Sequence, residues 1–470
     1  MTAGALRYQA CSMRKVHRFA SVTVLVIAVM VFVAPLAHSL ERQPSSVYHA
    51  RRVALAGKLH GGVAVLFAAE EPLLDFMPYR QDEDFYYLTG WNEPGAALLI
   101  VADAGQAQTA GTQAPRTYQE ILFLPTRDLR MEKYTGAKLD AVSPGVVEAT
   151  GVDAAQQLME LPAVLNRLID GDRRLLRNLW AQPESAQAKA LVGITAVTLG
   201  QDANAISSRD VTVLTQQLRV VKDEGEIALL KKAADASIDA QRVMMRAAKP
   251  GVTERALAGK MTAAWMEDGC ERASYAPIVG SGINSTTLHY SENTRTLEDG
   301  DILLVDAACE YSMYASDITR TVPVNGHFTP RQREIYNVVL GAQQAAIDAF
   351  VAGKSKINDR DRRDPDSLDN AAYNYINMHG KDLRGQPLGQ YWLHGLGHMV
   401  GINVHDPADY PALLKPGMVF TIEPGVYIPE EKLGVRIECV FLVGADGKLI
   451  DLVAALPHTA EDVEAAMQGK

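Results

Sequence analysis

Three histidines lie in one glycine-rich stretch of this sequence. The segment 392–406 reads WLHGLGHMVGINVHD and contains His394, His398 and His405. The first two are four residues apart, as in a helical zinc motif, but each nearby glycine would cost a helix about 1 kcal/mol relative to alanine. A strand or loop is therefore predicted. Because imidazole is a common metal ligand and glycine permits close backbone approach, the segment is a candidate metal site. A surface loop with satisfied histidines is the alternative.

Four acidic residues end or interrupt apolar runs that predict buried strands. The runs are 302–306, 314–319, 419–423 and 434–440, and the acids are Asp306, Asp317, Glu423 and Glu438. An ionised carboxylate is costly to bury without a cation. Arg436 lies two residues before Glu438, which predicts that both point from one face of a strand. One arginine cannot neutralise four acids, so these carboxylates and one imidazole of the histidine segment predict a ligand set for two divalent ions.

An oxygen-rich ligand set favours hard or borderline ions. Mn²⁺ is the predicted metal, with Co²⁺ and Zn²⁺ as alternatives. Paired divalent ions in hydrolases lie about 3.5–4 Å apart and lower the pKa of water towards about 7. The predicted chemistry is metal-assisted hydrolysis, with Glu423 as the base that handles the proton of the attacking water.

The elements that carry these residues are predicted from helix-start signals and apolar periodicity. Asp223 and Glu226 form a capping-box pair at the start of a first helix. Thr253 begins a second helix, and Thr329 begins a third that runs to about Phe350. Upstream apolar runs at 62–69, 96–102 and 121–124 predict strands of a smaller α/β domain. The predicted inward faces are Ile227, Leu230, Ala234, Ile238 and Met245 in the first helix, and Leu257, Met261 and Trp265 in the second.

An acidic stretch that continues into aromatic residues has two interpretations. Residues 80–87 read RQDEDFYY. A solvated turn before a strand is the favoured interpretation, because charge runs usually face water. The alternative is the rim of a substrate site.

Composition limits the class of protein. The chain has 470 residues, enough for two or three domains, and a net charge of -10 that argues against a nucleic-acid binder. Cys270, Cys309 and Cys439 are an odd number at wide spacings without a CxxC pair, so buried free thiols are predicted.

The amino-terminal 39 residues have the layout of a signal peptide. Arg14, Lys15 and Arg18 precede the apolar run 20–36, and small residues follow at 37 and 39. Cleavage after Ser39 and export of the remainder to the periplasm or outside the cell are predicted. An uncleaved membrane anchor is the alternative, since the run approaches the length that spans a bilayer.

The segment 394–406 resembles the signature of the aminopeptidase P and prolidase family, and residues 79–90 resemble its amino-terminal domain. The resemblance implies an α/β domain at 40–212, followed by an α+β "pita-bread" catalytic domain at 213–470. It implies the metal ligands Asp306, Asp317, His398, Glu423 and Glu438. It also implies catalytic roles for His289, His394, His405, Glu423 and Arg436 in contacting substrate, moving protons or supporting the carboxylates.

The resemblance further implies an Xaa-Pro aminopeptidase, which releases the first residue of peptides with proline in second position. A prolidase restricted to dipeptides is the alternative, and an inactive binding protein is a third possibility, although all five ligands are present. A homodimer or homotetramer is expected. The sequence departs from the family at Cys439, where an Asp or Asn usually follows the last ligand. Since Cys439 alternates to the opposite face from Glu438, little effect on ligation is expected.

Overall fold

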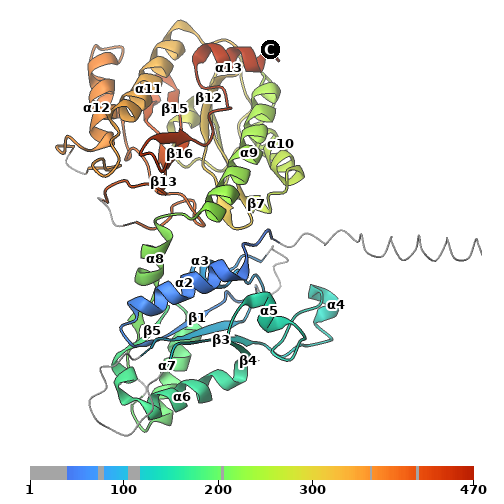
Figure 1. Ribbon diagram of the computed structural model, residues 1–470. Coiled ribbons are helices and arrows are strands. Elements are labelled where there is room, and N and C mark those ends of the chain that lie inside the picture. The colour runs from blue at the N-terminus through green and yellow to red at the C-terminus, as the bar shows by residue number, and fades with distance from the viewer. Residues whose placement is uncertain are drawn as a thin grey trace, which may run out of the picture. The chain divides into compact units, whose positions relative to one another are not determined.

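The computed structural model describes residues 40–71, 79–103, 117–202, 206–359, 362–408 and 412–469 (Figure 1). The predicted signal peptide, residues 1–39, lies outside this part of the chain. None of the helices described is long and apolar enough to cross a membrane. Residues Arg42–Lys470 form one compact unit, and the contacts below lie within it.

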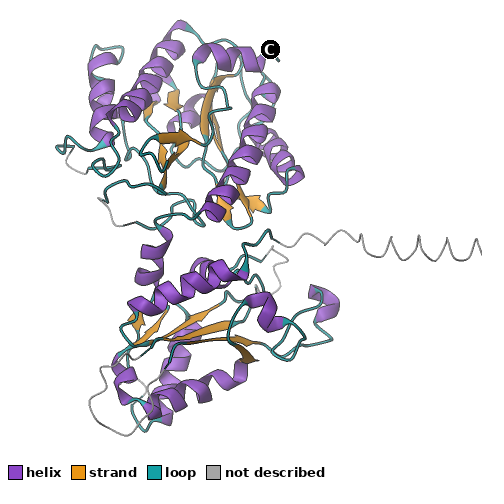
Figure 2. Cartoon of the chain, viewed as in Figure 1, coloured by secondary structure: helices purple, strands orange, loops and turns teal. Residues whose placement is uncertain are grey.

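A six-stranded mixed sheet organises the amino-terminal region, with strand order β4-β3-β2-β1-β5-β6. The predicted strands are confirmed as β1, β2 and β3, which pair antiparallel. Figure 2 shows helices on both faces of this sheet. The strands are β1 Val63–Phe67, β2 Ala97–Val101, β3 Gln119–Leu124, β4 Ala154–Gln157, β5 Leu179–Ala181 and β6 Arg209–Asp210, and the helices are α2 Ser45–Lys58, α3 Glu83–Thr89, α4 Glu132–Thr135, α5 Val146–Thr150, α6 Leu161–Gly171 and α7 Ala186–Thr198.

The predicted turn at residues 80–87 is wrong, because most of this stretch forms helix α3. Asp82 caps the helix by accepting a hydrogen bond from the Phe85 N–H at 2.8 Å. Gly90 ends it in a left-handed conformation with φ 59°. Residues 84–89 are all buried. Burial of the aromatic side chains therefore places the acidic stretch against the fold and not in a solvated turn.

The three predicted helices are confirmed as α9 Glu224–Ala247, α10 Glu254–Glu267 and α11 Pro330–Ala349. Both sides of the predicted capping box are formed at the start of α9. The predicted inward faces of α9 and α10 are buried, except that Ile227 is only half-buried. A short helix, α8 Thr212–Arg219, precedes α9, and α12 Leu368–His379 and α13 Ala460–Met467 complete the helices described here.

Short antiparallel sheets carry the predicted site. One has the strand order β12-β9-β8, a second β13-β16-β17, a third β11-β10-β7, and β14 pairs with β15. The strands are β7 Arg272–Ala273, β8 Ile278–Ser281, β9 Ile302–Asp306, β10 Cys309–Tyr311, β11 Tyr314–Ala315, β12 Thr319–Pro323, β13 Val419–Ile422, β14 Gly425–Ile428, β15 Leu433–Arg436, β16 Cys439–Val443 and β17 Leu449–Asp451.

Two predicted strands have different bounds because the chain changes partner within them. The stretch 314–319 contains the end of a β10–β11 hairpin and the first residue of β12, which is the true partner of β9. The stretch 434–440 is two strands, since β15 pairs with β14 whereas β16 pairs with β13. Glu438 therefore lies in a break between strands and not on the same strand as Arg436.

The prediction of free thiols at Cys270 and Cys309 is wrong, because they form a disulfide with Cα atoms 6.1 Å apart. They are 39 residues apart in sequence. Pairing of Ala273 with Cys309 between β7 and β10 brings the end of α10 beside β10. Cys439 is a buried free thiol, as predicted.

Candidate metal centre

The five predicted metal ligands come together in the structure. Asp306 ends β9, Glu423 follows β13, and Asp317 and Glu438 lie in the breaks before β12 and β16. Together with His405, their ligand atoms form overlapping groups within 4.8 Å, namely Asp306–Asp317–Glu438, His398–Glu423–Glu438 and Asp317–His398–His405. Glu438 belongs to two of these groups, so it can serve two neighbouring ions.

The histidine segment is a loop, as predicted, and it runs along β13. The Thr421 N–H donates to the His398 carbonyl at 2.9 Å, and the Glu423 N–H donates to the Leu396 carbonyl at 2.9 Å. A Cβ atom at Gly397 would lie 2.1 Å from the Thr421 carbonyl oxygen. Glycine at position 397 therefore allows His398 to pack directly against the strand that ends at Glu423.

The centre contains more negative than positive charge. Arg436 contacts Asp306 at 2.5 Å, and it is the only arginine or lysine paired with the four acids in the part of the chain described. In the metal-free protein, burial raises the pKa of Asp306 and Glu438, and raises that of Glu423 to about 7. These carboxyl groups therefore hold a proton more tightly than carboxyl groups in water do.

His398 responds to the same excess of negative charge. Burial alone would lower its pKa, but a hydrogen bond to Asp317 and the charge of Glu423 raise it to about 9. The His398 Nε2 atom lies 3.2 Å from Asp317 and 3.4 Å from Glu423. A divalent ion would replace the proton that these three groups share.

One oxygen of Glu438 provides the test of whether a metal fits. Its Oε2 accepts a hydrogen bond from the Thr319 hydroxyl at 2.7 Å, whereas its Oε1 is buried with no hydrogen-bond partner among the described residues. A buried unsatisfied carboxylate oxygen is unfavourable by about 1–3 kcal/mol or more. A divalent cation would satisfy this oxygen and balance the four carboxylates, so the residues fit a metal centre.

Two tyrosines that sequence reasoning missed support the centre. The Tyr275 hydroxyl lies 2.5 Å from Asp306 and 2.6 Å from Asp317. The Tyr427 hydroxyl accepts from Arg436 at 2.8 Å and lies 2.8 Å from the His394 ring. The alternation of β14 could have pointed to Tyr427, but Tyr275 lies in a loop without any periodic signal.

The remaining predicted histidines lie on different sides of the centre. His289 and His405 line a cavity of about 260 Å³ together with Asp306 and Asp317. His394 lines another cavity, of about 730 Å³, which also contains Trp392 and Arg362. Burial, followed by the charge of Arg436, lowers the pKa of His394 to about 4, so its ring is neutral at pH 7.

A further missed residue, Glu254, holds the segment that carries His289. Its buried carboxylate accepts hydrogen bonds from the Ser281 N–H, the Tyr290 hydroxyl and the Arg295 N–H, each at 2.8 Å. Glu254 had been visible in the sequence only as an ordinary first-turn acid of α10. Its three partners lie 27, 36 and 41 residues further along the chain.

Four carboxylates and a histidine placed so that they could hold divalent ions are typical of a metal-dependent hydrolase. Comparison with known families makes this more specific. Residues 228–445 match the profile of Metallopeptidase family M24, and residues 48–176 match that of Aminopeptidase P, N-terminal domain.

Individual relatives agree along most of the chain. An Xaa-Pro aminopeptidase of Haemophilus influenzae is 34% identical over 422 residues, which cover 83% of this chain and 89% of that protein. One of Escherichia coli is 33% identical over 444 residues, covering 89% and 97%. The solved structure of proline aminopeptidase P II from Yersinia pestis matches with a TM-score of 0.78 and 31% identity, over 91% of this chain and all of that one.

This chain belongs to the aminopeptidase P family of metallopeptidases. The expected architecture, a smaller α/β domain followed by a pita-bread catalytic domain, is confirmed. The boundary at 212/213 and the roles of the individual site residues stay predictions.

Proposed function

We propose that this chain is an Xaa-Pro aminopeptidase, which hydrolyses the bond between the first residue of a peptide and a proline in second position. The excess of carboxylates around the unsatisfied oxygen of Glu438 is the observation that carries the proposal. This excess supports a centre that is able to bind metal. An active member of this family requires such a centre, whereas an inactive binding protein does not. The names of the relatives support the Xaa-Pro preference.

Two divalent ions would be held by the five predicted ligands. Mn²⁺ is the proposed metal, because four of the ligands offer carboxylate oxygen and none offers sulfur. When bound, such ions polarise a carbonyl group and lower the pKa of water. The ligands are Asp306, Asp317, His398, Glu423 and Glu438.

Other steps of the reaction, namely proton transfer and contacts with the substrate, would be carried out by side chains of the protein. Glu423 would take the proton of the attacking water. Arg436, through its 2.5 Å contact, partly offsets the rise in the pKa of Asp306 that burial causes. The neutral His394, or His289 across the centre, would hold the reacting carbonyl group or the leaving imino nitrogen. His405 would contact the peptide from the cavity that it shares with His289.

The test is hydrolysis of two substrates by protein stripped of metal and resupplied with Mn²⁺. An Xaa-Pro dipeptide and an Xaa-Pro-Yaa-Zaa tetrapeptide are compared by mass spectrometry of the products. Release of the first residue from the tetrapeptide is expected. Cleavage of the dipeptide alone would instead establish a prolidase. If neither peptide is cleaved with Mn²⁺, Co²⁺ or Zn²⁺, the enzymatic proposal is wrong.

The cellular place and the assembly of the protein are also proposals. The signal-like residues 1–39 support export, with cleavage after Ser39. Fractionation of cells followed by amino-terminal sequencing would show whether the exported protein begins at Leu40. A homodimer or homotetramer is proposed from the family resemblance. Light scattering coupled to size-exclusion chromatography would measure it, and a monomer would contradict it.

A further inference from the structure

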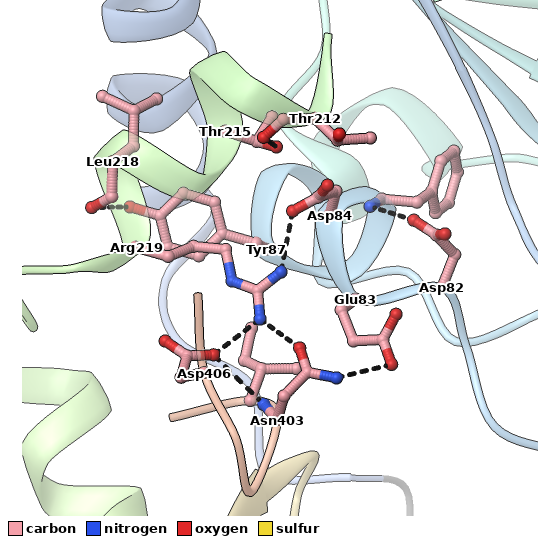
Figure 3. Close-up of polar contacts among 12 residues, drawn as sticks. Asp82, Glu83, Asp84, Tyr87, Thr212, Thr215, Leu218, Arg219, Asn403 and Asp406 are labelled. Carbon is pink, nitrogen blue, oxygen red and sulfur yellow. Dashed lines mark hydrogen bonds and ion pairs between the residues drawn. The ribbon is translucent and has the colours of Figure 1, made fainter. Parts of the chain in front are cut away.

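A second buried cluster of charges lies outside the metal centre, and Figure 3 shows the contacts of Arg219 in it with Asp84, Asp406 and Asn403. The cluster consists of Asp84, Arg219, Lys222 and Asp406, and is called the Arg219 cluster below. Arg219 donates to Asp84 at 2.8 Å and to Asp406 at 2.6 Å, while Lys222 donates to the other oxygen of Asp406 at 3.0 Å. The Arg219 side chain is 4% exposed and that of Asp406 is 1% exposed. Two cations and two anions balance, so this cluster requires no bound ion.

The Arg219 cluster joins three parts of the chain that are distant in sequence. Asp84 comes from α3 of the amino-terminal region, and Arg219 and Lys222 come from the end of α8 and the turn after it. Asp406 ends the glycine-rich histidine segment. Arg219 is therefore a link between the sheet domain and the loop that carries His405.

Further contacts hold the same loop from the amino-terminal side. The Asn403 side chain accepts from Arg219 and donates to Glu83 at 2.9 Å. Arg80 donates to the Ile402 carbonyl at 3.0 Å. These contacts involve side chains and backbone of residues 402–406 but none of the metal ligands.

The local backbone transmits this arrangement to His405. The Asp406 N–H donates to the Met399 carbonyl at 2.8 Å, and a Cβ atom at Gly401 would lie 2.4 Å from the Asp406 carboxylate. Glycine at 401 thus makes room for the carboxylate inside the loop. The neighbouring His405 ring lies 3.8 Å from the His398 ring, centroid to centroid. The contacts that hold Asp406 in place consequently restrict the position of the adjacent His405 side chain beside the metal centre.

Stability alone does not account for such a cluster. Desolvation of buried charges offsets most of their attraction, so apolar residues of similar volume often stabilise a fold equally well. What the charges provide is directionality, since a guanidinium group that binds several acceptors at once defines their relative positions.

We propose that Arg219 and Asp406 are positioning residues for the peptidase reaction, which hold His405 beside the metal centre and make the amino-terminal helix α3 part of the catalytic apparatus of the same chain. The inference rests on the proposed function. It concerns residues that touch neither the metal ligands nor the substrate cavity.

The first test compares two buried arginines. Arg219→Met removes the proposed positioning contacts, whereas Arg51→Met is the matched control. Arg51 also joins the amino-terminal region to the start of α9, through Asp223 at 2.6 Å, and is 6% exposed. Its hydrogen bonds and ion pairs go to Tyr87, Asp223 and Glu226 and not to residues 402–406. We expect kcat/KM on the tetrapeptide to fall by about 10- to 100-fold in Arg219→Met, because a displaced catalytic group is costly, and by less than about twofold in Arg51→Met. Equal losses in both variants would overturn the proposal.

A double-mutant cycle tests whether Arg219 acts through His405. In a His405→Ala background, Arg219→Met should reduce kcat/KM by less than about twofold further, because the group that it positions is already absent. If the two substitutions reduce kcat/KM by factors that simply multiply, Arg219 does not act through His405. Arg219→Lys, which retains the charge but not the planar fork, should recover only part of the activity.

A readout without catalysis separates this inference from the proposed function. In metal-free protein labelled with [¹³Cε1]histidine, the His405 signal, identified by its loss in His405→Ala, should shift in Arg219→Met and not in Arg51→Met. This holds even if the wild-type chain cleaves no peptide. Should Arg219→Met fail to fold, Asn403→Ala removes the side-chain contacts with Arg219 and Glu83 without unpairing a charge, and it should shift the same signal. An unchanged His405 signal in either folded variant would refute the positioning role.

Discussion

The two buried charge clusters of this protein differ in their balance. The Arg219 cluster pairs two cations with two anions, and its carboxylates find all their partners within the chain. The metal centre sets four carboxylates against Arg436 and His398 and leaves Glu438 Oε1 without a hydrogen-bond partner among the described residues. A balanced cluster can define the position of a loop, whereas an unbalanced one stores unfavourable electrostatic energy that bound ions relieve. Charge counting within a buried cluster therefore separates a structural network from a ligand site.

The largest effect should come from the unsatisfied carboxylate. Glu438→Gln should lower kcat/KM by roughly 10³-fold, since several kcal/mol of charge stabilisation disappear with the metal. The same change should make the metal-free protein more stable at pH 8, by about 1–3 kcal/mol, because a buried carboxylate without a cation is removed. Metal analysis and urea unfolding measure the two effects.

The control is Glu310, a buried carboxylate that binds Arg272 at 2.6 Å and Arg80 at 2.9 Å. Glu310→Gln should destabilise the metal-free protein, because it leaves cations without their partner. If both glutamine variants change stability in the same direction, the contrast between balanced and unbalanced clusters fails.

Within the Arg219 cluster, replacing one member of an ion pair should lower the free energy of unfolding more than replacing both members. Lys222→Met leaves Asp406 short of one cation and should destabilise the fold by about 3 kcal/mol or more. Adding Asp406→Asn should recover part of that loss, since charge balance improves. Urea unfolding of both single variants and the double variant gives the coupling energy. Simple addition of the two losses would argue against a balanced cluster.

Two neighbouring acids at the start of α3 should show opposite pH dependence. Burial raises the pKa of Asp82 to about 7, so the folded state holds its proton more tightly than the unfolded state. The stability associated with Asp82 is full below about pH 4 and is lost as the pH rises towards 7. Asp82→Asn keeps a cap acceptor, and should therefore gain stability relative to wild type as the pH rises, by about 1–2 kcal/mol at pH 8.

Glu83 is the opposing control for that experiment. Burial would raise its pKa, but Arg80 at 2.5 Å lowers it overall. Its contribution to stability is therefore present above about pH 4.5 and is lost as the pH falls further. Glu83→Gln should be less stable than wild type at pH 7 and should approach it in acid. The prediction fails if unfolding free energies of both variants follow the pH in parallel.

The smallest effect is expected at Cys439, which adjoins Glu438 but belongs to neither cluster. Its thiol lies 3.6 Å from Arg320, and burial raises its pKa to about 11, so it stays neutral. Cys439→Ala should change kcat/KM by less than about twofold, because the thiol contacts no ligand side chain. A tenfold loss would show that this departure from the family pattern tunes the metal centre.

The sequence alone determined the parts that depend on neighbouring residues. The capping box of α9 needs only Asp223 and Glu226, which lie three residues apart. The loop character of the histidine segment follows from its glycines, which disfavour helix. The ligand set could also be predicted, because ionisable residues in apolar runs are too costly to keep unless a cation binds them.

Only the tertiary structure decided which distant groups meet. Tyr275, Glu254 and Arg219 look like ordinary polar residues until strand and loop packing places them against their partners. The Cys270–Cys309 disulfide and the break between β15 and β16 were missed for the same reason. Each depends on which strand lies beside which, and local sequence patterns do not contain that information, because strand pairing is a property of the whole fold.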